Sequence, residues 1–366
     1  MGTALVWNAD GVLAGASMTL TTEPILLHPK RPFVTAKDQT NVSESVLVRI
    51  EHQGVVGLGE AKASADSCGG IGEDVCALAA GIEPLLGDDP FLVGDILDRA
   101  GAKLPQACCT LAGIDIALHD LCAKLLGVPL YRWFGLNPDR APCTSYTLGI
   151  DSMDGVLAKL DEAGDFPILK IKVGFPGDVD IVAAIRQRTR SILRLDANGG
   201  WPVDEAVERI RAMEEFDIEF IEQPIPPGNP EALREIRRKI GVPLLVDEDA
   251  QKAADLPRLA GCVDGVNIKL MECGGLREAL RMVHVARALG MRVMLGCMME
   301  SSLSLTAAAH LSPLADYGDL DSALLIDNDP FIGFGLEDGR IVLPDGPGIG
   351  ARWRESGCST RRPLDQ

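Results

Sequence analysis

Charged residues stand at the ends of short apolar segments in the second half of the chain. Three of them are carboxylates, and one lysine precedes and another follows these three in the sequence. Carboxylates brought close together repel one another strongly unless a cation lies between them. Oxygen-only ligands favour Mg²⁺, and no His or Cys stands beside them to favour zinc. The pattern predicts a magnesium site with a lysine on either side, made of Lys172, Asp196, Glu222, Asp247 and Lys269.

Lys172 and Lys269 could act on one substrate carbon from opposite sides. A free lysine has a pKa of about 10.4 and is a poor base at neutral pH. A neighbouring cation, here Lys170 or the metal, disfavours the ammonium form and would lower that pKa toward about 7–8. One lysine would then remove a proton and the other would return it on the opposite face. This chemistry is a racemisation or an epimerisation.

The spacing of the charged residues predicts the elements that hold them. The five residues lie 22 to 26 positions apart, about the length of a βα unit. Eight strand candidates between residues 143 and 321 predict a (β/α)8 barrel. Residues two apart share a face of a strand, so one face of several strands carries charged or polar side chains into the barrel. These pairs are Lys170 with Lys172, Arg194 with Asp196, Asn267 with Lys269 and Asp319 with Asp321.

The remaining sequence predicts a smaller domain and a returning tail. Residues 18–62 alternate as strands, and residues 70–127 have helical periodicity, which indicates an α+β domain. A segment rich in Pro and Gly at 132–143 marks a boundary. We expect an α+β capping domain at 18–135, a barrel domain at 140–325, and a C-terminal segment at 326–366 that packs back on the capping domain.

Composition and charge exclude several classes of protein. The 366 residues are 46% hydrophobic and 24% charged, an ordinary globular balance. No segment approaches 18 uninterrupted apolar residues, which excludes a membrane-spanning helix. A net charge of −18 argues against nucleic acid and anionic membranes as partners. Ten cysteines without CxxC spacing, and a leader at 1–17 without signal-peptide features, indicate a cytoplasmic protein.

Five motifs follow one another along the predicted barrel: KIKVG at 170–174, LDANGGW at 195–201, IEQPI at 221–225, VDED at 246–249 and NIKL at 267–270. Together they resemble the enolase superfamily, in its muconate-lactonizing-enzyme subgroup. The resemblance implies a modified (β/α)8 TIM-type barrel with an N-terminal α+β capping domain. It also implies Mg²⁺, a lysine acid–base pair, an enediolate formed when the α-proton leaves, and a homo-oligomer.

The fold does not by itself define the reaction within this subgroup. Asp319-Leu320-Asp321 resembles the dipeptide epimerases, in which such a pair holds the free α-ammonium of the substrate. Two carboxylates on one face can bind an ammonium through charge-assisted hydrogen bonds. We therefore predict a magnesium-dependent epimerase that acts at the α-carbon of the C-terminal residue of a dipeptide. The alternatives are an o-succinylbenzoate synthase, an N-acylamino acid racemase, a muconate-type cycloisomerase, or a non-catalytic binding protein.

Further residues are expected to contact the substrate or to orient the metal ligands. Lys170 would help bind the substrate carboxylate, and Thr147 stands at the end of the first barrel strand. The resemblance places Lys37 toward the second residue of the dipeptide, which favours L-Ala-D/L-Glu. The adjacent Asp38 could instead neutralise Lys37 or attract a basic dipeptide. Residues that would orient the carboxylates are Asn198, Gln223 and Glu248.

Overall fold

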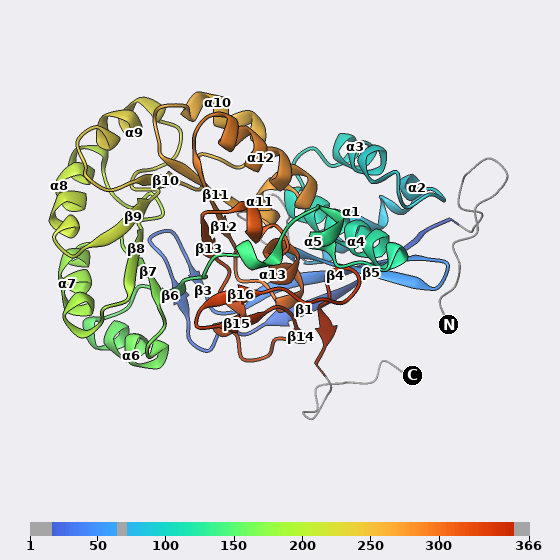
Figure 1. Cartoon of the computed structure of the whole chain (residues 1–366), viewed down its shortest axis with the longest axis horizontal. Coiled ribbons are helices and arrows are strands. Elements are labelled where there is room, and N and C mark those ends of the chain that lie inside the picture. Colours follow the sequence, from blue (N-terminus) through green and yellow to red (C-terminus); the bar gives the residue numbers. More distant parts are fainter. Residues whose placement is uncertain (1–16, 64–71, 355–366) are drawn as a thin grey trace.

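Eight parallel strands form a barrel in which each strand lies beside the next one along the chain (Figure 1). The computed structural model describes residues 17–63 and 72–354. A bridge between Thr144 and Gly318 joins the first and last strands, so the predicted barrel is confirmed. The strands are β6 (Tyr146–Leu148), β7 (Ile168–Lys172), β8 (Ile192–Asp196), β9 (Ile218–Glu222), β10 (Leu244–Val246), β11 (Gly265–Lys269), β12 (Arg292–Gly296) and β13 (Tyr317–Asp319).

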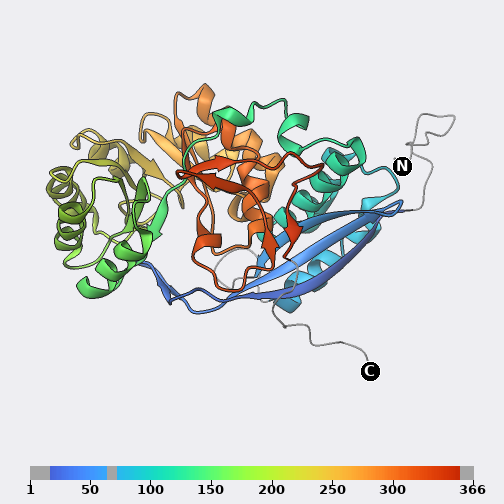
Figure 2. The ribbon, with the colours of Figure 1, turned by 60° about the horizontal axis from the view of Figure 1, so that its bottom comes forward.

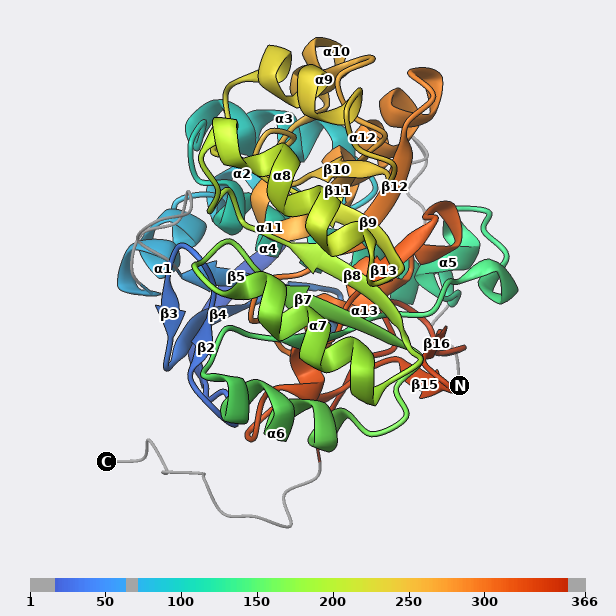
Figure 3. The same cartoon turned by 90° about the vertical axis from the view of Figure 1, so that its left-hand side faces the viewer.

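Helices cover the outer side of these strands (Figures 1 and 3). Leu169, Ile171 and Val173 are fully or nearly fully buried in the main apolar core, as the alternation along β7 predicts. The polar residues of the same strands therefore face the barrel interior. The helices are α6 (Met153–Ala163), α7 (Asp178–Arg188), α8 (Val203–Glu214), α9 (Pro230–Arg237), α10 (Leu256–Leu259), α11 (Leu270–Cys273), α12 (Leu276–Ala288) and α13 (Ser302–Ala309), with short 3₁₀ turns at Pro138–Arg140, Ala253–Asp255, Ser312–Leu314 and Ser322–Leu324.

The N-terminal sheet is antiparallel and packs against one long helix. Strands β1 (Thr19–Leu27), β4 (Ser43–His52) and β5 (Val55–Ala63) form the sheet, and α4 (Cys108–Leu126) lies on β5. A Cβ at Gly59 would stand 2.0 Å from the carbonyl oxygen of Gly113, so only glycine permits this approach. The other helices of this half are α1 (Gly72–Ala80), α2 (Glu83–Leu86), α3 (Val93–Lys103) and α5 (Leu130–Trp133).

A loop from the N-terminal sheet reaches the barrel mouth. It carries the hairpin β2 (Phe33–Val34) and β3 (Gln39–Thr40) and extends toward α6 (Figure 2). The Lys30 amide donates to the Leu325 carbonyl at 2.8 Å, and the Ile150 amide donates to the Val34 carbonyl at 2.9 Å. We name residues 28–40 the mouth loop. It links the carboxyl ends of β13 and β6.

The C-terminal segment returns toward the N-terminal helices. The Ile349 amide donates to Asp120 of α4 at 2.7 Å, and the Leu130 amide donates to the Gly348 carbonyl at 2.9 Å. The division of the chain into three parts stays a prediction. The strands of the segment are β14 (Phe331–Ile332), β15 (Gly335–Glu337), β16 (Arg340–Val342) and β17 (Arg352–Trp353).

Two further expectations concern membrane-spanning helices and the N-terminal leader. None of the described helices has the length and apolarity to span a bilayer. The expected leader lies outside the described residues except for Ser17, as do Cys68 and Cys358.

Candidate active site

The structure brings the five charged residues to one end of the barrel. Lys172 lies opposite Asp196 in the register of β7 and β8, and Asp196 lies opposite Glu222 in the register of β8 and β9. Asp247 directly follows β10, and Lys269 is the last residue of β11. All five therefore lie at the carboxyl ends of neighbouring strands, where barrel enzymes bind their substrates.

Lys170 is the centre of a buried ion cluster. Its Nζ lies 3.0 Å from Asp196 Oδ2 and 2.8 Å from Glu222 Oε2. It also lies 2.6 Å from Asp319 Oδ2. Burial lowers the pKa of Lys170, but the attraction of the three carboxylates outweighs burial and raises the pKa well above its ordinary value. Lys170 is therefore an ammonium group that lies among three carboxylates at the centre of the barrel mouth.

Lys172 contacts the first of the three predicted metal ligands. Its Nζ donates to Asp196 Oδ2 at 2.7 Å and to Asn198 Oδ1 at 3.0 Å. The backbone of Asn198 has a φ of 43°, and its amide turns back to donate to Asp196 Oδ1 at 2.9 Å. Burial raises the pKa of Asp196, but the charges of Lys170 and Lys172 outweigh it and hold the pKa below its ordinary value. Asp196 is therefore an ionised carboxylate.

Lys269 lies across the barrel from Lys172. Strands β7 and β11 are four positions apart in the eight-stranded sheet, so they stand on opposite sides of the barrel. Lys269 Nζ lies 2.5 Å from Asp247 Oδ2 and 3.4 Å from Glu272 Oε1. Burial lowers the pKa of Lys269, but these carboxylates raise it well above its ordinary value. This direction is opposite to the lowered pKa expected for a catalytic lysine, because Lys269 is ion-paired here.

The donor set of the three carboxylates fits a divalent cation. Asp196, Glu222 and Asp247 are each at most 1% exposed. Buried Asp247 Oδ1 has no hydrogen-bond partner, which is a costly arrangement for a carboxylate oxygen. Burial and the charge of Asp196 raise the pKa of Glu222 to about 6, while burial and Glu272 raise that of Asp247 well above its ordinary value. A cation held among them would give Asp247 Oδ1 a partner and would stabilise the ionised forms of Glu222 and Asp247.

The carboxylates do not surround one point in the arrangement described. Among residues 17–63 and 72–354, no three Asp, Glu, His or Cys side chains converge closely enough to hold a metal ion. The Lys170 ammonium instead occupies the place where Asp196 and Glu222 meet. The Lys269 ammonium pairs with the third carboxylate, that of Asp247.

The two aspartates at the carboxyl end of β13, Asp319 in the strand and Asp321 two residues later, differ in their partners. Asp319 pairs with Lys170 and accepts a hydrogen bond from the Ser145 hydroxyl. Asp321 Oδ2 accepts a hydrogen bond from the Thr147 amide at 2.6 Å, and no basic side chain of the described residues pairs with it. Burial and the charge of Asp319 raise the pKa of Asp321 to about 7. An incoming cationic group would stabilise its ionised form.

The mouth loop brings Lys37 to the metal-ligand end of the site. Its ammonium pairs with Glu248, and its side chain is 44% exposed. Glu248 Oε1 also accepts a hydrogen bond from Asn198 Nδ2 at 3.3 Å. Gln223 Oε1 accepts from the Asp247 amide at 3.1 Å. The three residues expected to orient the carboxylates therefore all lie beside them.

Some residues of the cluster were not assigned a role from the sequence. Ser145 donates to Asp319, Asn267 donates to Glu222 Oε1 at 2.8 Å, and Glu272 contacts Lys269. Asn267 is two residues before Lys269 on β11, so the alternation along the strand predicts that it points into the barrel. Ser145 meets Asp319 from 174 positions away, so no local pattern could have indicated the contact.

Two family models match the chain and together cover most of it. Residues 18–135 match the N-terminal domain of mandelate racemase / muconate lactonizing enzyme. Residues 153–357, more than half of the chain, match the enolase C-terminal domain-like model. The chain belongs to the mandelate racemase / muconate lactonizing enzyme family. The resemblance to the enolase superfamily is thereby confirmed.

Relatives in this family include proteins named for dipeptide chemistry. An L-Ala-D/L-Glu epimerase of Bacteroides thetaiotaomicron is 40% identical over 352 residues, covering 96% of this chain and 91% of the relative. A dipeptide epimerase of Cytophaga hutchinsonii, solved with Mg and D-Ala-L-Val, has a TM-score of 0.88 at 28% identity, covering 93% of this chain and 97% of the other. A substrate-liganded L-Ala-D/L-Glu epimerase of Bacillus subtilis has a TM-score of 0.86 at 31% identity, covering 91% and 97%.

Proposed function

We propose that this protein is a magnesium-dependent dipeptide epimerase that inverts the α-carbon of the C-terminal residue. The observation that carries the proposal is the pair of lysines, Lys172 and Lys269, on opposite sides of a carboxylate cluster. Two bases facing one carbon suit a 1,1-proton transfer, in which a proton leaves one face and returns to the other. The likeness to the Bacteroides thetaiotaomicron and Cytophaga hutchinsonii epimerases supports the same activity.

Each charged residue then has a distinct role. Asp196, Glu222 and Asp247 would hold Mg²⁺, which when bound neutralises the substrate carboxylate and the negative charge that develops on it. Lys170 would bind the same carboxylate from the barrel interior. Lys172 and Lys269 would each take or return the α-proton at Nζ.

The acidic pair supports a substrate with a free N-terminus. Asp321 is buried, lacks a basic partner among the described residues, and lies beside the ion-paired Asp319. An α-ammonium group would supply the missing charge. An N-acyl substrate offers no such group, so the arrangement favours a dipeptide over an N-acylamino acid or a cycloisomerase substrate.

Lys37 supports an acidic second residue. Its ammonium already pairs with a carboxylate, that of Glu248, at the edge of the site. A glutamate side chain of the substrate would compete for that partner. We therefore propose an L-Ala-D/L-Glu substrate, which is the substrate named for the relatives from Bacteroides thetaiotaomicron and Bacillus subtilis.

A deuterium-incorporation screen tests the activity. The protein, with Mg²⁺ in D₂O, would be given a library of L-Ala-L-Xaa dipeptides, and mass spectrometry would detect exchange. We expect a gain of one mass unit, with L-Ala-L-Glu among the best substrates. Lys37→Met should lower the ratio of kcat/KM for L-Ala-L-Glu to kcat/KM for L-Ala-L-Leu about tenfold. Exchange of N-acylated amino acids but of no dipeptide would contradict the proposal.

We also propose a cytoplasmic location and a homo-oligomeric assembly. The ten cysteines include no CxxC pair, which supports a reducing compartment. The family resemblance supports the assembly. Light scattering after size-exclusion chromatography would measure the mass, and a monomer near 39.0 kDa would contradict the second proposal.

A further inference from the structure

A short loop that follows β12 lies against the turn that follows β13. We name residues 297–301 the β12 loop. The Glu300 amide donates to the Ser322 hydroxyl at 3.2 Å, and this hydroxyl donates to the Glu300 carbonyl at 2.8 Å. Ser322 directly follows Asp321, and both residues are buried. One serine hydroxyl therefore joins the β12 loop to the residue next to Asp321.

A second contact joins the same two segments. The Cys297 thiol donates to the Asp319 carbonyl at 3.3 Å. Gly296 and Asp319 lie opposite each other in the register of β12 and β13. The β12 loop therefore lies beside both members of the acidic pair, Asp319 and Asp321, and contacts the chain at each of them through backbone and hydroxyl groups.

The side chain of Glu300 holds the β12 loop in its shape. Its carboxylate accepts hydrogen bonds from the Met298 amide at 2.7 Å and from the Ser304 hydroxyl of α13. Glu300 is buried, and burial, followed by the charge of Glu60, raises its pKa to about 7. Because both partners are polar groups of a largely buried segment, loss of the Glu300 side chain would leave them without these bonds.

The N-terminal sheet holds the other side of the β12 loop. Glu60 of β5 is fully buried and accepts hydrogen bonds from the Ser301 amide at 3.1 Å and from the Ser301 hydroxyl. The Ser43 hydroxyl of β4 donates to the Met299 carbonyl at 2.7 Å, and Lys62 Nζ donates to the same hydroxyl at 2.6 Å. The loop is therefore fixed between the N-terminal sheet and the turn after β13.

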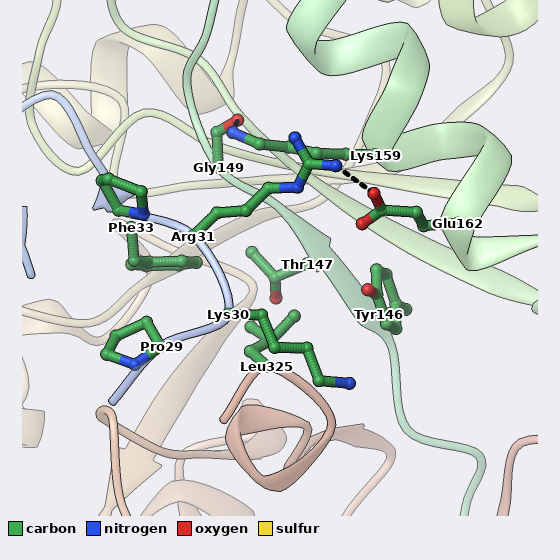
Figure 4. A pocket seen from close by; sticks show the side chains of 11 residues that line it. Pro29, Lys30, Arg31, Phe33, Tyr146, Thr147, Gly149, Lys159, Glu162 and Leu325 are labelled. Atoms are coloured by element: carbon green, nitrogen blue, oxygen red, sulfur yellow. Dashed lines mark hydrogen bonds and ion pairs between the residues drawn. The ribbon is translucent and has the colours of Figure 1, made fainter. Parts of the chain in front are cut away.

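The turn after β13 is held on its other side by the mouth loop and by β6. The Lys30 amide donates to the Leu325 carbonyl at 2.8 Å, and the Thr147 amide donates to Asp321 Oδ2 at 2.6 Å. Leu325, Thr147 and Lys30 line one small cavity (Figure 4). Ser322 is therefore the residue through which the β12 loop reaches a turn that other segments hold from the opposite side.

We infer that Ser322 and Glu300 are positioning residues for the carboxylate of Asp321. The inference rests on the proposed function, in which this carboxylate binds the substrate ammonium. Asp321 lies two residues beyond the end of β13, so the hydrogen bonds of the sheet do not fix its place. The Ser322 hydroxyl fixes it instead, and Glu300 holds the loop that binds this hydroxyl. A charge-assisted hydrogen bond weakens when its distance and angle change, so a displaced Asp321 binds the ammonium less tightly.

Ser322→Ala tests the inference, because it removes both hydrogen bonds to the Glu300 backbone. We expect KM for L-Ala-L-Glu to rise about tenfold, while kcat changes less than threefold. The inhibition constant of N-propionyl-L-Glu, which has the skeleton of the dipeptide without its amine, should change less than twofold. The matched control is Ser312→Ala in the turn before β13, a buried serine whose hydroxyl has no hydrogen-bond partner among the described residues. It should leave both constants as in the wild type.

Two substitutions of Glu300 separate positioning from a general loss of structure. Glu300→Ala should raise KM for the dipeptide as Ser322→Ala does. Glu300→Gln should restore it to within about twofold of the wild type, since an amide can bond both the Met298 amide and the Ser304 hydroxyl. Circular dichroism would confirm that each variant is folded.

The outcomes distinguish the inference from the proposed function. A wild-type KM in folded Ser322→Ala, or an equal loss of affinity for L-Ala-L-Glu and N-propionyl-L-Glu, would overturn the inference alone. A Glu300→Gln variant as impaired as Glu300→Ala would also overturn it. The absence of exchange by the wild-type protein with every dipeptide would instead overturn the proposed function.

Discussion

The buried charged side chains at the barrel mouth are ion-paired with one another. Lys170 forms ion pairs with three carboxylates, Lys172 pairs with Asp196, and Lys269 pairs with Asp247. A buried ion left without a partner is strongly unfavourable. The pairs therefore offset the cost of burying these charges. Asp321 is the exception, because no basic side chain of the described chain pairs with it.

Asp321→Asn should weaken binding of the substrate ammonium. Loss of a charge-assisted hydrogen bond costs about 1.5–3 kcal/mol, which corresponds to roughly a 10- to 100-fold lower kcat/KM for a dipeptide. Steady-state epimerisation of L-Ala-L-Glu measures the change. Asp327→Asn removes the same charge from an exposed position and should have little effect. An almost silent Asp321→Asn would favour a substrate without an amine.

The orientation of a side chain could be predicted from the sequence where the residue belongs to a repeating pattern. The two-residue alternation along β7 and β11 indicated that Lys170, Lys172 and Lys269 point into the barrel. The pKa of Lys269 could not be predicted, because it depends on Asp247 and Glu272 at distances that only folding sets. Ser145 was missed for the same reason.

At the scale of elements, the mouth loop closes over glycine-rich turns of the barrel. A Cβ placed at Gly200 would stand 2.4 Å from the Gly174 carbonyl oxygen and 2.8 Å from Ala36 Cβ. Two barrel loops and the mouth loop therefore meet with no room for a side chain. The LDANGGW motif supplies Asp196 and Asn198, and its Gly200 also packs against the mouth loop, which carries Lys37.

Gly200→Ala should displace the mouth loop from its contact with Gly174 and Gly200. Overpacking of this kind costs about 1–3 kcal/mol in the free energy of unfolding. We expect a lower melting temperature and a several-fold higher KM for the dipeptide, with a smaller change in kcat. Thermal unfolding and steady-state kinetics measure both effects. Gly101→Ala on α3, where a new methyl would meet no described atom within 4 Å, should leave KM unchanged.

Regular elements were predictable because each has its own period. The spacing of 22 to 26 residues between Lys172, Asp196, Glu222, Asp247 and Lys269 indicated successive βα units, and the barrel confirms it. The hairpin of β2 and β3 was not predicted. Each of its strands has two residues, too few for an alternating pattern, and the hairpin's Val34 carbonyl accepts from the distant Ile150 amide.

At the scale of the whole molecule, His310 joins three parts of the chain. It ends α13 of the barrel, its Nδ1 accepts from the Tyr131 amide at 3.1 Å, and its Nε2 lies 2.8 Å from the Ile349 carbonyl. This arrangement requires a neutral ring with the proton on Nε2. Burial lowers the pKa of His310 to about 4.

His310 should make the fold sensitive to acid. Between pH 6.5 and about 4 the unfolded chain binds a proton that the folded chain does not, so stability falls as the pH falls. The difference corresponds to about 3 kcal/mol. His310→Gln should be less stable at pH 7, and this deficit should shrink by about that amount at pH 4. Urea unfolding across this range measures the effect, and His284→Gln on the exposed face of α12 should keep the wild-type profile.

The central claim is that two lysines serve one α-carbon from opposite faces, and exchange by single-lysine variants tests it most directly. L-Ala-L-Glu and L-Ala-D-Glu would each be incubated in D₂O with Mg²⁺ and either Lys172→Ala or Lys269→Ala. Both variants should bind Mg²⁺ and lose epimerisation by at least about 100-fold. Each should still exchange the α-proton of one epimer, and the two variants should exchange opposite epimers. Near-normal epimerisation by either variant, or exchange of the same epimer by both, would contradict the account.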